Sequence, residues 1–474
     1  MNDRGVSQGG VLEPQQIIDA ALSAASAEGC IVVVQSGTEA NVRWANNTVT
    51  TNGLARTLSW FVVAFSGGAA GTVAASAASA DSVQSVAEVV QAAQRAADAA
   101  ARAGRAQDEQ PLMTSTSGGD LDFDEPAVST TFDVFGELLG SLANGFDAAR
   151  SGDRILYGFA RHEVTTTYLG SSTGLRLRWV QPTGLLEVNA KSADLSRSAW
   201  AGLSTADFVG VDVAAVDATL AGRLDWARRS IDLPPGRYDT VLPPTAVADF
   251  LIYLAWSAGA RPAHEGRSAF SAPGGGTRLG ERLTDRPFTL FSDPRAAGLE
   301  AAPFLVTAHS GDEVSVFDNG ASIGRVDILA DGVIANLLHT RGSAAEYHEP
   351  FTPSCDNLVL TGGDQDRGID DLVAGVRRGL LVTSQWYLRD VDPMTLLLTG
   401  LTRDGVFLIE NGEIAGAVNN FRFNMSPLDL LKQASDVGRT EPALSREWSD
   451  WFTRSAMPPI VVEGFNMSSV SKAQ

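Results

Sequence analysis

The stretch at residues 238–283, YDTVLPPTAVADFLIYLAWSAGARPAHEGRSAFSAPGGGTRLGERL, decides how the rest of the chain is interpreted. It predicts a short strand, an apolar helix that begins after Pro243 and Pro244, a basic turn, and a Ser-Ala-Phe segment that runs into three glycines. A helix of this kind can carry the ligands of a catalytic zinc ion. The first question is therefore whether this helix contains them.

A catalytic zinc site needs two closely spaced imidazoles, a third ligand from elsewhere and a carboxylate that takes a proton from the bound water. His264 and Glu265 resemble the start of such a motif, but no second histidine follows four or five residues later. A His-Glu pair beside glycines is typical of a solvated surface, so we do not expect this pair to bind a metal.

The remaining histidines do not complete a site. His162 lies in a predicted strand and His309 follows one. His339, Glu346 and His348 are the set that could converge on a metal ion, and a solvated loop is the expected alternative. The sequence therefore predicts no metal in this chain.

Length, charge and apolar runs limit the class of protein. The 474 residues exceed one ordinary core, and a Pro-rich segment at 233–237 predicts two domains, residues 1–232 and 233–474. The net charge of −20 and the lack of a Lys/Arg-rich run exclude nucleic acid as an expected partner. The N-terminus does not resemble a signal peptide, and the apolar runs are too short to span a membrane. We therefore expect a cytoplasmic protein with no membrane partner.

The two cysteines, Cys30 and Cys355, are far apart in the sequence and have no neighbouring ligands at zinc-finger spacing. Free thiols in a reducing compartment are therefore expected rather than a disulfide. Cys355 could act as a nucleophile, but no basic neighbour would lower its pKa, so a buried structural thiol is the expected role.

Residues 1–232 are expected to form a sheet with flanking helices. Helices are predicted at 14–28, 81–102, 132–150 and 213–229. Strands are predicted at 31–35, 41–51 and 56–66, with a turn at Asn52-Gly53, and a meander of four short strands is predicted between 154 and 203.

Residues 233–474 are expected to be rich in strands. Asn319-Gly320, Asp331-Gly332 and Asn411-Gly412 predict hairpin turns. Strands are predicted at 313–317, 322–329, 332–338, 379–386, 394–401, 405–410 and 413–421, and a helix at 361–378. The fold class expected for the whole chain is α+β.

Several stretches together resemble the TldD/PmbA (modulator of gyrase) peptidase family. They are RWANNTVTTNG at 43–53, YDTVLPPTAVADFL at 238–251, GRSAFS at 266–271, RLGERL at 278–283, FTLFSDP at 288–294, RGLLVTS at 378–384 and TRDGVFLIENGEIAGAVNNFRFN at 402–424. They occur in the family's order and span nearly the whole chain. The resemblance implies the family's two-domain fold, with an N-terminal sheet and flanking helices and a β-rich C-terminal domain.

The resemblance also locates the family's zinc site. In the catalytic branch a His-Glu-x-x-x-His helix follows the Val-Leu strand, and a Cys near the C-terminus completes the site. Counted from Val241-Leu242, the ligand positions fall on Ile252, Tyr253 and Ser257, which cannot bind zinc in that way, and the tail at 457–474 contains no Cys. The chain thus resembles the PmbA/TldE branch, and residues Val247, Phe250, Leu251 and Leu254 are expected to keep the helix as a packing element.

The function implied is that of a metal-free TldE/PmbA-like subunit that pairs with a zinc-bearing TldD-like subunit. Such a heterodimeric metallopeptidase encloses a chamber where unfolded or leader-bearing peptides are cut. This chain would shape the chamber and hold substrate as an extended strand. The candidate substrate-binding residues are Arg43, Asn46 and Asn47 in the polar strand, and Arg267, Ser268 and Phe270 in the segment at 266–271.

Two alternatives stay open. The chain could be a homo-oligomeric metallopeptidase with a non-standard site built from His264 and Glu265 together with His339 or His348. It could also be a peptide-binding regulator without enzymatic activity. Metal analysis and co-purification distinguish these alternatives from the heterodimer.

Overall fold

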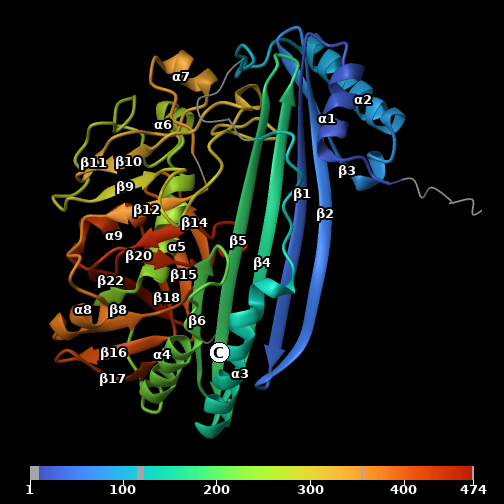
Figure 1. Ribbon diagram of the computed structural model, residues 1–474. Coiled ribbons are helices and arrows are strands. Elements are labelled where there is room, and N and C mark those ends of the chain that lie inside the picture. Colours follow the sequence, from blue (N-terminus) through green and yellow to red (C-terminus); the bar gives the residue numbers. More distant parts are fainter. Residues whose placement is uncertain (1–9, 115–121, 355, 472–474) are drawn as a thin grey trace, which may run out of the picture.

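The computed structural model describes residues 10–114, 122–354 and 356–471. Cys355 lies outside this part of the chain. Figure 1 shows a sheet of very long strands on one side and a body of shorter strands on the other. The α+β class and the two-part arrangement expected from the sequence are confirmed. Among the described residues, no helix combines the length and apolar content needed to cross a bilayer.

The N-terminal sheet is antiparallel and has the strand order β3-β2-β1-β4-β5-β6. Its strands are β1 (Gly29–Ala45), β2 (Thr48–Ser66), β3 (Ala69–Ser76), β4 (Arg154–Ser171), β5 (Arg176–Ser192) and β6 (Ser198–Thr205). The consecutive strands β4, β5 and β6 form the expected meander, but β4 and β5 are two long strands in place of the four short ones predicted between 154 and 203.

Strand β5 runs unbroken through Pro182 because of where this residue lies in the sheet. Pro182 pairs with Val164 of β4, while β6 joins β5 only from Gly184 onward. On its other side Pro182 has no strand neighbour in the described sheet, so its missing N–H removes no ladder hydrogen bond there.

The predicted turn at Asn52-Gly53 is wrong. The turn lies at Asn46 and Asn47, whose φ angles are 53° and 57°, and Gly53 is an ordinary strand residue opposite Asn41. Two consecutive residues with positive φ form the turn type that suits a two-residue hairpin, and Asn tolerates this conformation. The polar segment at 43–51 is therefore the tip of the β1–β2 hairpin rather than a separate strand.

In the part of the chain that the structure describes, four helices pack on the N-terminal sheet (Figure 1). They are α1 (Pro14–Ala24), α2 (Val83–Ala103), α3 (Gly136–Ser151) and α4 (Val213–Trp226), and short 3-10 turns lie at η1 (Ala77–Ser79) and η2 (Phe132–Phe135). The pair α1 and α2 buries one half of the sheet with Ile18 and Val90, and the pair α3 and α4 buries the other half with Leu142 and Leu220. Cys30 lies in the first of these cores, where burial raises the pKa of its thiol to about 12, so it is the inert free thiol that was expected.

Two sheets form the C-terminal part. The six-stranded sheet contains β9 (Thr289–Ser292), β10 (Val326–Ala330), β11 (Val333–Ile334), β12 (Leu358–Thr361), β20 (Glu441–Ala443) and β21 (Ser455–Met457). The ten-stranded sheet contains β7 (Ser230–Ile231), β8 (Gly236–Leu242), β13 (Arg378–Val382), β14 (Gln385–Asp392), β15 (Leu397–Thr402), β16 (Val406–Glu410), β17 (Glu413–Val418), β18 (Phe421–Met425), β19 (Ala434–Val437) and β22 (Ile460–Val470). The first of these strands, β7, already belongs to the C-terminal sheet and precedes residue 233.

Helix α5 (Pro244–Trp256) lies between these two sheets, because it contacts β20 and β21 of one and β8 and β14 of the other. Val247, Phe250, Leu251 and Leu254 are all fully buried, so the packing stripe predicted from the sequence is confirmed. The remaining helices are α6 (Ala260–His264), α7 (Arg341–Tyr347), α8 (Ile369–Gly375) and α9 (Pro427–Lys432), with a 3-10 turn at η3 (Val316–Asp318).

Several predicted C-terminal elements are shorter than expected. Residues 313–317 form no strand, residues 332–338 contribute only the two residues of β11, and the helix predicted at 361–378 is only α8. The helix is short because Gly362 and Gly363 lie in close contact with other backbone segments and the chain enters α8 only at Gly368. Tertiary contacts thus override the local pattern in this region.

Candidate functional site

The ligand positions expected from the family resemblance fall on Ile252 and Tyr253 in α5 and on Ser257 directly after it. Ile252 is fully buried, and the ring of Tyr253 lies 5.9 Å from the indole of Trp448. The hydroxyl of Ser257 donates a hydrogen bond of 2.8 Å to the backbone carbonyl of Tyr253. In the described part of the chain, no group of three metal-ligating side chains lies on this helix.

The segment at 443–452 covers α5 and is fixed to it through Asp249. One carboxylate oxygen of Asp249 accepts hydrogen bonds from the hydroxyl of Ser445 at 2.5 Å and from the backbone N–H of Glu447 at 3.1 Å. Burial raises the pKa of Asp249 to about 7, against the opposing effect of these hydrogen bonds. Trp256 adds an edge contact with Trp448 at 5.1 Å, so aromatic side chains fill this side of the helix.

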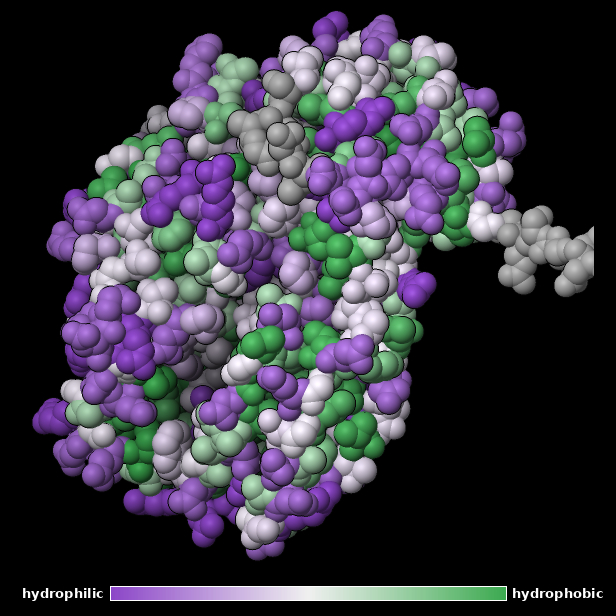
Figure 2. Space-filling model, viewed as in Figure 1, coloured by the Kyte–Doolittle hydropathy of each residue, from purple (hydrophilic) through white to green (hydrophobic). Residues whose placement is uncertain are grey.

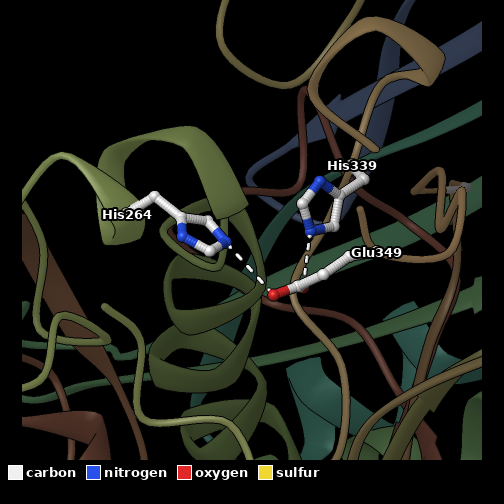
Figure 3. A group of neighbouring side chains, drawn as sticks. All are labelled: His264, His339 and Glu349. Atoms are coloured by element: carbon white, nitrogen blue, oxygen red, sulfur yellow. Dashed lines mark hydrogen bonds and ion pairs between the residues drawn. The ribbon is translucent and has the colours of Figure 1, made fainter. Parts of the chain in front are cut away.

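Three potential metal ligands meet elsewhere, at the end of α6. His264, His339 and Glu349 place their ligand atoms within 4.8 Å of one another (Figure 3). The Nε2 atom of His339 lies 2.9 Å from one carboxylate oxygen of Glu349, and the Nε2 atom of His264 lies 3.2 Å from the other. Both imidazoles therefore point at a single carboxylate.

Backbone hydrogen bonds bring these residues together from distant parts of the sequence. The N–H of Ala260 donates to the carbonyl of Leu338 at 2.9 Å, and the N–H of Leu338 donates to the carbonyl of Ala258 at 2.8 Å. Helix α6 then carries His264 one turn further. After α7, His348 has a φ of 59°, and this left-handed residue turns the chain so that Glu349 faces the two histidines.

Neighbouring side chains fix the orientation of both rings. The ring of His264 is stacked on that of Tyr347, with centroids 3.8 Å apart and an interplanar angle of 2°. The Nδ1 atom of His339 lies 3.0 Å from the hydroxyl of Ser343. Burial lowers the pKa of His339, although Glu349 acts in the opposite direction, so the neutral imidazole is favoured.

The set proposed from sequence, His339 with Glu346 and His348, does not form. Glu346 binds Arg261 at 2.7 Å, and His348 is exposed on the turn. Glu265 pairs with Arg267 at 2.6 Å instead of joining its neighbour His264. Glu349 was missed because nothing in the local sequence shows that the chain reverses at His348.

The candidate substrate residues at the hairpin tip have structural partners. The side chain of Asn47 is buried, where it donates to the carbonyl of Arg154 at 2.9 Å and accepts from the N–H of Leu156 at 2.7 Å. Asn46 accepts a hydrogen bond from the hydroxyl of Tyr157 at 2.9 Å. Arg43 is exposed and lies over the ring of Phe159 at 4.6 Å.

The candidate residues in the segment at 266–271 differ in how far they are buried. Arg267 is exposed and ion-paired with Glu265 and Asp312. Phe270 is fully buried and Ser268 is 7% exposed, so neither lies on a surface that a peptide could reach. The hairpin tip and α6 lie at opposite ends of the molecule in Figure 1, so the two groups do not form one site.

Two models of protein families match this chain. Residues 235–469 match the family model described as the PmbA/TldA metallopeptidase C-terminal domain, and residues 30–101 match PmbA/TldA metallopeptidase domain 1. No curated protein matches the chain.

Solved structures match over nearly the whole length. TldE from Thermococcus kodakarensis is 15% identical with a TM-score of 0.71, covering 95% of this chain and 99% of its own. A proposed modulator of DNA gyrase from Thermotoga maritima is 16% identical with a TM-score of 0.74 and the same coverage. A third such protein, from Bacteroides thetaiotaomicron, is 15% identical with a TM-score of 0.73, covering 96% and 98%. At these identities the likeness concerns the fold.

Proposed function

The chain belongs to the PmbA/TldD family of metallopeptidases, and on this premise we propose that it is the TldE-like subunit of a heterodimeric peptidase. Its partner would be a TldD-like subunit that carries the catalytic zinc on a His-Glu-x-x-x-His helix. The complex would work in the cytoplasm, where it would degrade unfolded peptides or remove leader peptides.

One observation carries this proposal, namely the packing of α5. Helix α5 keeps its place between two sheets, but Ile252 is in the core and Tyr253 packs on Trp448. A zinc ion at this helix would need imidazoles facing a space for water and substrate. The side chains present supply packing contacts in place of that space, which favours a subunit whose catalytic zinc belongs to its partner.

This subunit would contribute a surface for the peptide backbone. Strand β2 pairs with β3 only from Ser59 onward, so residues 48–58 have β1 on one side and no described strand on the other. Most of these residues are exposed. An unpaired strand edge can bind an extended peptide without demanding a particular sequence. We therefore assign the substrate role to this edge, with the exposed Arg43 beside it.

Complex formation tests the proposal. The chain is mixed with a TldD-like protein from the same genome that has an intact His-Glu-x-x-x-His helix, and the masses are measured by size-exclusion chromatography with light scattering. We expect a stable complex with one copy of each chain or multiples of that ratio. Two separate peaks at micromolar concentrations would contradict the proposal.

The meeting of His264, His339 and Glu349 favours a second candidate, a metallopeptidase that acts without a partner through a non-standard site. This candidate requires that the purified chain alone hydrolyse peptides. It also requires that His264→Gln abolish that activity while the exposed control His309→Gln does not. Absence of hydrolysis by the chain alone would exclude it.

A further inference from the structure

The cluster formed by His264, His339 and Glu349 has no part in the proposed subunit role. It lies on α6 and on the segment around α7, whereas the family-type zinc positions lie on α5. Two imidazoles and one carboxylate are a common donor set for zinc in proteins. The question is whether the three groups are arranged as ligands or only as hydrogen-bond partners.

The distances between the donor atoms fit a single ion. A tetrahedral zinc ion with bonds of about 2.0–2.1 Å holds its ligand atoms roughly 3.3 Å apart. The Nε2 atoms of His264 and His339 lie 3.2 Å and 2.9 Å from the oxygens of Glu349. These distances run to two different oxygens of Glu349, and the three ligand atoms all lie within 4.8 Å of one another, so side-chain rotations that shorten the longest separation would bring them to the spacing of one ion.

The hydrogen bonds of the cluster are incomplete. The Nε2 atom of His264 is buried, and despite its distance of 3.2 Å from Glu349 it has no partner with hydrogen-bond geometry among the described residues. A buried polar atom without a partner is destabilising. A cation between the ring and the carboxylate would accept the lone pair of this nitrogen and remove that destabilisation.

His339 is held as metal-binding histidines usually are. Its Nδ1 atom lies 3.0 Å from the hydroxyl of Ser343, which also hydrogen-bonds with Thr340. The Nε2 atom hydrogen-bonds to Glu349 at 2.9 Å; with an ion bound, Nδ1 would donate to Ser343 and the lone pair of Nε2 would face the ion. Such outer partners fix the tautomer and the ring orientation of ligating histidines.

The charges around the cluster leave Glu349 without a cation. Arg261 is bound by Glu346 at 2.7 Å, and Arg267 is bound by Glu265 at 2.6 Å. Among the described residues, the only ion-pair partners of Glu349 are the two histidines. A largely buried carboxylate needs a compensating charge. Figure 2 shows hydrophilic and hydrophobic residues side by side on the surface over α6 and α7.

We propose that His264, His339 and Glu349 bind one divalent transition metal ion, with Zn²⁺ as the best match to this donor set. Within the described residues, no fourth His, Cys, Asp or Glu joins the group, so water would complete the coordination. The bound ion would clamp α6 to the segment at 339–349. The expectation of a chain without metal would then hold only for α5.

Zinc binding by the purified chain tests this site without reference to peptidase activity. The chain is freed of metal, and Zn²⁺ binding is measured by isothermal titration calorimetry and by metal content after gel filtration. We expect one zinc ion per chain and a higher melting temperature with Zn²⁺ than with a chelator. Cobalt substitution should produce the visible absorption of a tetrahedral site.

Variants locate the ion. His264→Gln and Glu349→Gln change partly exposed side chains and should weaken Zn²⁺ binding by about 100-fold or more. Two controls, His348→Asn and His309→Gln, change exposed histidines outside the cluster and should bind as the unchanged chain does. Asn suits the left-handed conformation at 348. Circular dichroism confirms that each variant is folded.

Two results would overturn the proposal. One is a folded chain that binds no zinc, and the other is zinc binding that His264→Gln and Glu349→Gln leave unchanged. Neither depends on whether the chain pairs with a TldD-like protein, so the metal site and the subunit role can fail separately.

Discussion

The indole Nε1 of Trp448 donates a hydrogen bond of 2.8 Å to the backbone carbonyl of Asp249, one turn before Tyr253 in α5. This contact joins the segment at 443–452 to the helix that carries zinc in catalytic relatives, as the family resemblance implies. The same indole packs on Tyr253 and Trp256. A single side chain thus packs against the helix at the positions where the resemblance implies zinc ligands in catalytic relatives.

Removing this side chain should destabilise the C-terminal part. Trp448 is 8% exposed, so Trp448→Ala leaves a cavity against α5 and a carbonyl without its donor. We expect a loss of about 3–5 kcal/mol in the free energy of unfolding, measured by urea titration. The matched control is Trp451→Ala, since Trp451 is 72% exposed and should change stability by about 0.5 kcal/mol or less. Equal effects of the two substitutions would contradict the packing described for α5.

Asp249 should make stability depend on pH in an unusual direction. Its pKa is about 7 in the folded chain, against about 3.9 when unfolded. Below pH 4 both states are protonated and the group has no effect on stability. Between about pH 4 and pH 7 the unfolded state ionises while the folded state keeps its proton, so stability falls as pH rises. Above pH 7 the loss is constant.

The substitution Asp249→Asn isolates this effect, because Asn keeps an oxygen that accepts from Ser445 and Glu447 but does not ionise. Relative to the variant, the unchanged chain should lose up to about 4 kcal/mol of unfolding free energy between pH 4 and pH 7. Urea titrations across this range provide the measurement. The control Asp450→Asn changes an exposed position, so its unfolding free energy should change with pH as that of the unchanged chain does. A constant difference between Asp249→Asn and the unchanged chain would show that Asp249 does not titrate in this range.

Substitutions at the hairpin tip distinguish a structural role of Asn47 from a role in substrate binding. Asn47→Ala removes two hydrogen bonds to β4 and places Ala at positive φ, so it should cost about 1–3 kcal/mol of stability. Asn46→Gly is the control, because Gly accepts the conformation at 46 and only one exposed hydrogen bond is lost. If Asn47→Ala weakened peptide binding with no change in urea midpoint, the structural role assigned to Asn47 would be wrong.

Features that depend on local sequence could be predicted, whereas features that depend on contacts between distant residues could not. The packing stripe of α5 was predictable because its apolar spacing is local. The hairpin turn was not, because Asn46-Asn47 and Asn52-Gly53 both fit turn chemistry. Only the pairing of β1 with β4, which anchors Asn47 through Arg154 and Leu156, selects between them.

The cluster of His264, His339 and Glu349 could not be predicted from local sequence patterns either. His264 and His339 are brought together by the backbone bridge between Gly259 and Leu338, which no local pattern announces. Glu349 joins them only because His348 takes a left-handed conformation that any sequence rule would assign first to Gly or Asn. Residues that meet through such contacts are visible only in the folded chain.

The central claim is that this chain is a TldE-like subunit whose catalytic zinc lies in its partner. The most direct test measures hydrolysis of an unfolded peptide by the chain alone, by a TldD-like protein alone, and by both together. We predict no hydrolysis by the chain alone, hydrolysis by the mixture that a zinc chelator abolishes, and full activity of the mixture when this chain carries His264→Gln. Hydrolysis by the chain alone that His264→Gln abolishes would contradict the account.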